Sequence, residues 1–65
     1  MTEFILVLFL CSAVHNTCLP PYHFHERFED PYKCMVTGYE ESAKKLKEIG
    51  QEEVNKQKIY IKFDC

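Results

Sequence analysis

Two cysteines and two histidines in the first half of the chain have side chains that could bind a metal ion. They are Cys18, His23, His25 and Cys34. Thiolate and imidazole groups are ligands that suit zinc, and two histidines separated by one residue point the same way from an extended segment. Zinc sites usually contain a tight pair such as Cys-x2-Cys or His-x3-His, however, and this sequence has neither. Zinc is therefore the alternative interpretation of these four residues.

The favoured interpretation of the cysteines is a disulfide framework without a cofactor. A chain of 65 residues is near the lower size limit for a domain held by a hydrophobic core alone. Such small domains usually need disulfides, a metal or a partner subunit. Four cysteines allow three connectivities, so the pairing depends on how the secondary structure elements are arranged. Free thiols are the third alternative.

No group of residues predicts catalysis. His15 follows Cys11 by four residues, but nothing in the sequence orients a cysteine–histidine nucleophile pair. The chain contains no glycine-rich phosphate-binding loop. Cys18 and Cys34 do not form a Cys-x-x-Cys redox motif. We therefore expect a protein that is not an enzyme.

The charged residues are interleaved along the chain. Eight basic and ten acidic residues give a net charge of −2. A nucleic-acid-binding protein would normally show a basic face or stripe, so we expect no nucleic-acid partner. This balance is typical of a solvated surface that attracts neither sign of charge.

The longest apolar run, residues 4–11, is expected to be a buried strand around which the chain is organised. A run that is apolar on both faces is typical of a strand covered on both sides, here over residues 3–11. The alternative is a secretory signal or anchor over residues 1–14. Glu3 stands where a signal peptide would carry Lys or Arg, and the run is too short to span a membrane. We expect no membrane partner.

Residues 15–30 are expected to form an irregular aromatic loop, because Pro20-Pro21 and the absence of a sustained period interrupt regular structure. One interpretation is a flap that buries its aromatic side chains against the sheet. The other is a recognition surface, because aromatic and arginine side chains dominate protein interfaces. The interaction candidates are Tyr22, Phe24, Arg27 and Phe28.

A helix over residues 31–49 and a strand over residues 58–64 are predicted next. Asp30 and Pro31 are typical of an N-cap and a first helical position, and Gly50 is typical of a C-cap. A stripe at helical spacing, through Met35, Tyr39, Ser42, Leu46 and Ile49, is expected to face the core. In residues 58–64, apolar and polar residues alternate, as in a half-buried strand.

These elements predict one small α+β domain, residues 1–65, built as a β–(long loop)–α–β unit. A helical crossover usually joins parallel strands, so strands 4–11 and 58–64 are expected to be parallel. Parallel pairing would bring Cys11 next to Cys65 and leave Cys18 to Cys34. A two-stranded sheet is seldom stable alone, so a homodimer that pairs sheet edges would complete the fold.

Three segments of the chain carry a resemblance to known sequences: FILVLFLCSAVHNTCLPPY, PYKCMVTGYEES and IYIKFDC, which include all four cysteines and the Cys-Met-x-x-Gly-Tyr segment. Through them the chain resembles a set of short uncharacterised proteins encoded by marine tailed phages. It implies a viral accessory or virion-associated protein, located in the virion or the infected host cell, and carries no activity with it. We therefore expect a structural or protein-interaction module that binds another protein or itself. The alternative is a small zinc-binding module in the host cytoplasm.

Overall fold

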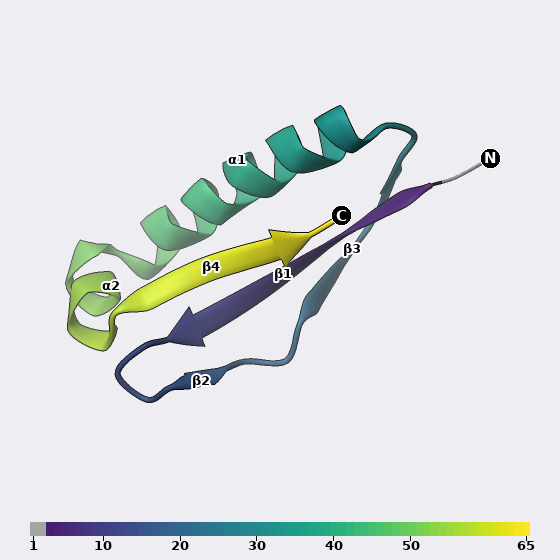
Figure 1. Ribbon diagram of the computed structural model, residues 1–65. Helices are drawn as coiled ribbons and strands as arrows, with labels where there is room; N and C mark the ends of the chain where they lie inside the picture. Colours follow the sequence, from purple (N-terminus) through teal and green to yellow (C-terminus); the bar gives the residue numbers. More distant parts are fainter. Residues whose placement is uncertain (1–2) are drawn as a thin grey trace.

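The structure is a computed structural model that describes residues 3–65. In chain order it contains β1 (Phe4–Ser12), β2 (Thr17–Cys18), β3 (Tyr22–Phe28), α1 (Pro31–Ile49), α2 (Gln51–Gln57) and β4 (Ile59–Asp64). Figure 1 shows one sheet with both helices outside it, and α1 running along one face. The predicted α+β class is confirmed. No helix within the described residues is long and apolar enough to cross a membrane.

The apolar strand β1 lies at the centre of the sheet, as its composition predicts. β4 pairs with one edge of β1, whereas β2 and β3 pair with its other edge at successive positions. All of these pairings are antiparallel. The sheet is therefore three strands wide, and β2 and β3 together form one interrupted outer strand.

The prediction of an irregular loop over residues 15–30 is wrong for residues 17–18 and 22–28, which form β2 and β3. β3 is hard to recognise because its register changes: Ile5 pairs with Arg27 but Val7 pairs with His23. The three residues 24–26 therefore stand opposite the single residue Leu6. Such a bulge breaks the simple alternation of a strand.

The predicted parallel orientation of strands 4–11 and 58–64 is also wrong. β1 and β4 are direct neighbours but antiparallel, with Val7 opposite Asp64 and Ser12 opposite Ile59. The reason is β3, which runs antiparallel to β1 and returns the chain to the N-terminal end of β1 before α1 begins. The helical crossover does join parallel strands, but they are β3 and β4, with β1 inserted between them.

The four cysteines do form two disulfides, but the predicted pairing is wrong. The bonds are Cys11–Cys18 and Cys34–Cys65, with Cα–Cα distances of 4.0 and 6.2 Å. Cys11 and Cys18 are opposite each other on β1 and β2. Because β4 is antiparallel to β1, the chain after Asp64 lies toward the N-terminal end of β1, next to the first turns of α1. This end of the sheet is where Cys65 meets Cys34.

The predicted caps of α1 are confirmed at both ends. The Asp30 carboxylate accepts a hydrogen bond from the backbone N–H of Lys33 at 2.8 Å, and Pro31 occupies the first turn. Gly50 ends the helix at a φ of 99°, which favours glycine, and its N–H donates to the carbonyl of Leu46. These local signals explain why the predicted bounds of 31–49 are correct.

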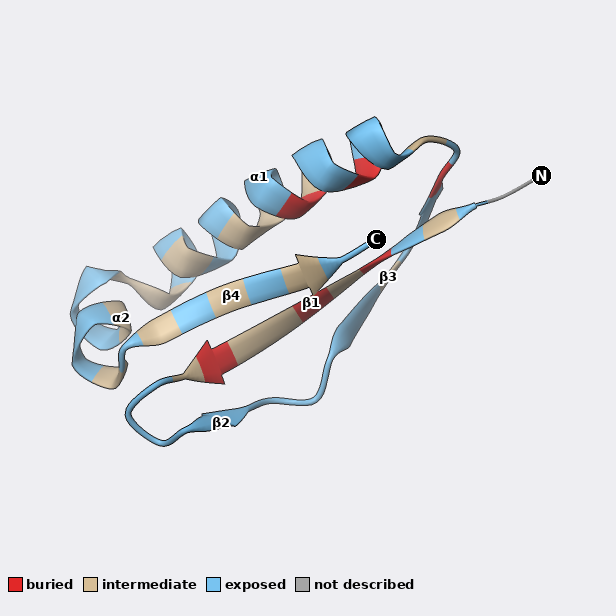
Figure 2. Ribbon diagram, in the orientation of Figure 1, coloured by how far each residue is buried: buried red, intermediate tan, exposed pale blue. Residues whose placement is uncertain are grey.

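The hydrophobic core lies between α1 and the N-terminal half of β1. Leu6, Phe28 and Cys34 are buried there, and three aromatic residues pack against them: Phe4, Phe24 and Phe63. Figure 2 shows the buried residues on β1, on the end of β3 and on the sheet-facing side of α1. The first half of the predicted helix stripe is displaced, because α1 buries Cys34 and Gly38 while Met35 and Tyr39 are 46% and 69% exposed. The rest of the stripe, Ser42, Leu46 and Ile49, is half-buried.

Gly38 allows α1 to approach β4 closely, and replacing it should destabilise the fold. A β-carbon at Gly38 would lie 2.5 Å from Cε2 of Phe63, which is closer than packed atoms tolerate. Alanine usually stabilises a helix interior by about 1 kcal/mol relative to glycine, whereas overpacking costs about 1–3 kcal/mol. We therefore expect Gly38→Ala to lower the free energy of unfolding by about 1 kcal/mol in urea denaturation.

The Phe63→Leu background provides the matched control for this prediction. Leucine removes the ring atoms that a β-carbon at position 38 would meet, so there Gly38→Ala should be neutral or stabilising. Equal losses in both backgrounds would contradict the close approach of Gly38 to Phe63.

Candidate protein-interaction site

A groove of about 440 Å³ lies between the second half of α1 and the outer strand formed by β2 and β3. Its floor is formed by residues of β1 and β4, of which Leu8 is buried and Leu10 and Ile61 are half-buried. Leu8 and Leu10 contribute from β1 because even-numbered residues of this strand face the helix. The lining residues are Leu8, Leu10, Leu19, Pro20, Tyr22, Phe24, Glu41, Lys44, Lys45, Glu48 and Ile61.

The groove is open because two prolines interrupt its outer strand. The Leu19 N–H still donates to the carbonyl of Leu10 at 2.9 Å, which continues the pairing begun by β2. Pro20 and Pro21 then have no N–H to donate, so the backbone ladder stops until β3 begins. Leu19, at 60% exposure, is left at the rim as a large apolar side chain.

An aromatic pair forms the wall of the groove that faces α1. Tyr22 and Phe24 are two residues apart on β3, so their side chains emerge on the same face of the sheet. Their ring centroids are 4.9 Å apart at an interplanar angle of 83°, an edge-to-face arrangement that aromatic pairs favour. Tyr22 is 59% exposed, so it presents contact area that the monomer does not bury.

The opposite wall of the groove carries charges of both signs from α1. Glu41, Lys45 and Glu48 alternate in sign at helical spacing, and Lys44 adds a second cation. Lys45 Nζ lies 3.2 Å from Glu48 Oε1, but both side chains are about half exposed. Because an exposed ion pair of this kind contributes little to stability, its members can pair with a ligand at small cost.

The four predicted interaction residues do not form one site. Tyr22 and Phe24 line the groove, whereas Phe28 belongs to the buried core. Arg27 pairs with Ile5 on the opposite face of the sheet, where its Nη1 lies 3.6 Å from Glu3 Oε1. Phe28 is buried, as the covering flap requires, whereas the recognition surface stays a prediction that now concerns Tyr22 and Phe24.

Sequence reasoning missed most of the groove floor and its charged wall. Leu8 and Leu10 belong to a run that is apolar throughout, so the sequence does not distinguish covered from uncovered positions. Glu41, Lys45 and Glu48 lie outside the predicted apolar stripe of the helix, so the pattern gave no reason to place them at a site. The sequence signal for the groove was Leu19, directly before two prolines, because an apolar residue in a turn is often left exposed. Leu19 is indeed exposed in the structure.

The alternative zinc ligands are not brought together. Cys18 is bonded to Cys11 and Cys34 to Cys65. His23 pairs with Val7 and so lies on the face of the sheet opposite α1. Within residues 3–65, no three His, Cys, Asp or Glu side chains lie close enough together to hold a metal ion.

Comparisons with protein-family models, with curated proteins and with solved structures give no match for this chain. The geometry of the groove is therefore the basis on which a function is proposed.

Proposed function

We propose that this chain is a non-catalytic, disulfide-stapled protein-interaction module that binds an amphipathic helix of a partner protein in the groove beside α1. The observation that carries the proposal is a groove beside α1 that is lined by apolar and aromatic side chains, of which Leu19 and Tyr22 are well exposed. A helix packed on a sheet buries one apolar stripe, and a second helix beside α1 would complete the layer.

The chemistry of the groove supports a helix as the occupant. Its floor is the face of the sheet, which accepts side chains, whereas an added strand would need the free backbone groups of a sheet edge. The charges at Glu41, Lys45 and Glu48 follow helical spacing, so a neighbouring helix with the opposite order of charges would match them. The partner segment should therefore have an apolar stripe flanked by alternating Lys and Glu.

The described lining residues also support a non-catalytic role. They are aliphatic, aromatic or charged, and none of them is a histidine, cysteine or serine that could act as a nucleophile or an imidazole base. The two disulfides suit an oxidising setting such as a virion surface. The relationship to marine-phage proteins and the virion-associated role stay predictions.

A designed peptide tests the groove directly. The probe is an amphipathic helical peptide about as long as α1, with a leucine stripe flanked by alternating Lys and Glu, titrated by calorimetry. We expect saturable binding, which the double variant Leu19→Ser/Tyr22→Ser should weaken at least about tenfold, because hot-spot side chains contribute at this level. Both residues are well exposed, so the fold should persist.

Tyr60→Ser is the matched control. Tyr60 is also about half exposed, but it pairs with Cys11 and lies on the opposite face of the sheet. Its replacement should leave peptide affinity unchanged. Lack of saturable binding, or an equal loss in the Tyr60 variant, would reject the groove as the binding site.

A further inference from the structure

The outer edge of β4 is free to pair with another strand. β4 is hydrogen-bonded to β1 along one edge, and no other strand within residues 3–65 pairs with it. Natural proteins usually protect such edges with proline, a bulge or an outward-pointing lysine. β4 contains no proline, and its single lysine, Lys62, has its Nζ 5.5 Å from the centre of the Phe9 ring on β1. Lys62 is thus directed away from the free edge.

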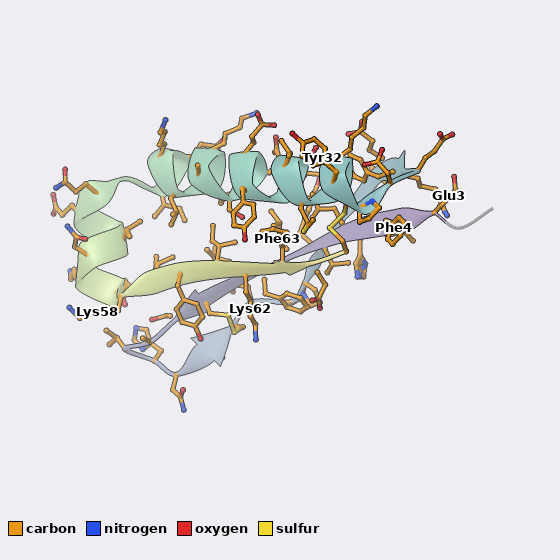
Figure 3. The ribbon with its side chains drawn as sticks, turned by 45° about the horizontal axis from the view of Figure 1, so that its top comes forward. Glu3, Phe4, Tyr32, Lys58, Lys62 and Phe63 are labelled. Carbon is orange, nitrogen blue, oxygen red and sulfur yellow. A yellow bond between two sulfur atoms is a disulfide. The ribbon has the colours of Figure 1, made fainter. Side chains whose placement is uncertain are left out.

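An apolar strip lies beside this edge on the helix side. The Tyr39 ring packs edge-to-face on Phe63 of β4, with centroids 4.9 Å apart, yet Tyr39 is 69% exposed. Met35 precedes Tyr39 by one helical turn and is 46% exposed. Figure 3 shows Phe63 directed toward α1 and Lys62 directed away from it. The flank of α1 above β4 therefore leaves aromatic and apolar surface uncovered.

We propose that two copies of this chain associate through the free edges of β4 into a symmetric dimer with one continuous antiparallel sheet. This inference does not depend on the proposed groove, which lies on the other flank of α1. The two helices lie on the same face of the joined sheet. Three strand spacings, about 14 Å, separate the two β1 strands under them.

The gap between the helices matches the exposed apolar strip. Helices in direct contact pack about 8–10 Å apart, so helices over two strands 14 Å apart would leave room between them. Tyr39 and Met35 of both copies would occupy this space, above Phe63 of both copies. The same side chains that are exposed in the monomer would be covered in the dimer.

Charge and the length of overlap together favour one register of this pairing. In an antiparallel pair related by a two-fold axis, residues on the same face must stand opposite each other. If the axis passes by Ile61, Tyr60 stands opposite Lys62 of the second copy. Lys58 directly precedes β4 as the C-cap of α2, so this register brings it beside Asp64 of the second copy. An axis by Lys62 would instead place two lysines opposite each other, and an axis by Tyr60 would bring Lys58 toward Lys62. An axis by Phe63 would pair Lys62 with Asp64, but it would join only residues 62–64 of β4, whereas the axis by Ile61 joins residues 59–63. The register centred on Ile61 is therefore self-complementary.

Charge reversal tests both the dimer and its register. We expect sedimentation equilibrium to show a concentration-dependent dimer of the intact, oxidised chain. Asp64→Lys should weaken dimerisation about tenfold, because two symmetry-related attractive pairs become repulsive. Adding Lys58→Asp to that variant should restore the affinity, because each pair then again joins one acidic and one basic side chain, with their positions exchanged.

Glu52→Lys is the control, because it makes the same change of charge at an exposed position in the first turn of α2, outside β4. It should leave the dissociation constant unchanged. A monomer at millimolar concentration would overturn the proposal. So would a dimer that Asp64→Lys does not weaken, or whose affinity Lys58→Asp does not restore, because either result places the interface elsewhere.

Discussion

Replacing both Cys34 and Cys65 by alanine should lower the free energy of unfolding by about 4 kcal/mol. This bond closes a loop of 31 residues, which restricts the unfolded chain more than a short loop does. A domain of this size has a total stability of roughly 3–10 kcal/mol, so the loss should leave a large fraction unfolded at physiological temperature. Urea denaturation without reductant, followed by circular dichroism, measures the change.

The second disulfide provides the control for this experiment. Cys11 and Cys18 are separated by only 7 residues, and the same loop model assigns about 2.5 kcal/mol to their bond. The Cys11→Ala/Cys18→Ala variant should therefore be more stable than the Cys34→Ala/Cys65→Ala variant. The reverse order would contradict this assignment of the larger stabilisation to Cys34–Cys65.

Replacing Leu6 by alanine should lower the free energy of unfolding by about 2–5 kcal/mol. Leu6 is fully buried, between β3 and α1, and is one of the two largest side chains with no exposed surface. Its truncation removes favourable burial and leaves a cavity among Phe28, Cys34 and their neighbours, which the Cys34–Cys65 bond prevents from closing freely. Urea denaturation of the oxidised variant measures this loss.

Leu10→Ala is the same substitution on the same strand and face, but in the open groove. Leu10 is only half-buried, so it has less burial to lose and water can occupy the space left behind. We expect a loss of about 1 kcal/mol. Losses of equal size at the two positions would show that the groove is filled in the free protein, which would also weigh against the proposed helix-binding site.

The elements with local signals could be predicted from the sequence. Asp30, Pro31 and Gly50 mark the ends of α1 because their backbone and hydrogen-bonding preferences act within one helical turn. The apolar run of β1 and the alternation of β4 likewise depend only on neighbouring residues. The presence of two disulfides followed from four cysteines in a chain too small for a large core.

The groove could be predicted only in part. Tyr22 and Phe24 were selected by residue type, and they do line it. Phe28 and Arg27, selected by the same reasoning, are separated from them because one is buried and the other lies on the opposite face. Residue type shows which side chains are suited to an interface, but the bulge in β3 decides which of them share a face.

The amino-acid sequence by itself determined helix α1, the apolar strand β1, the alternating strand β4 and the capacity for two disulfides. Only the tertiary structure decided the direction of β4, the cysteine pairing and the position of the groove. The physical reason is one strand: β3 is stabilised by its ladder with β1 rather than by its own pattern, and it reverses the chain before α1 begins. Because of that reversal β4 is antiparallel to β1, so Cys65 pairs with Cys34 and not with Cys11 as predicted.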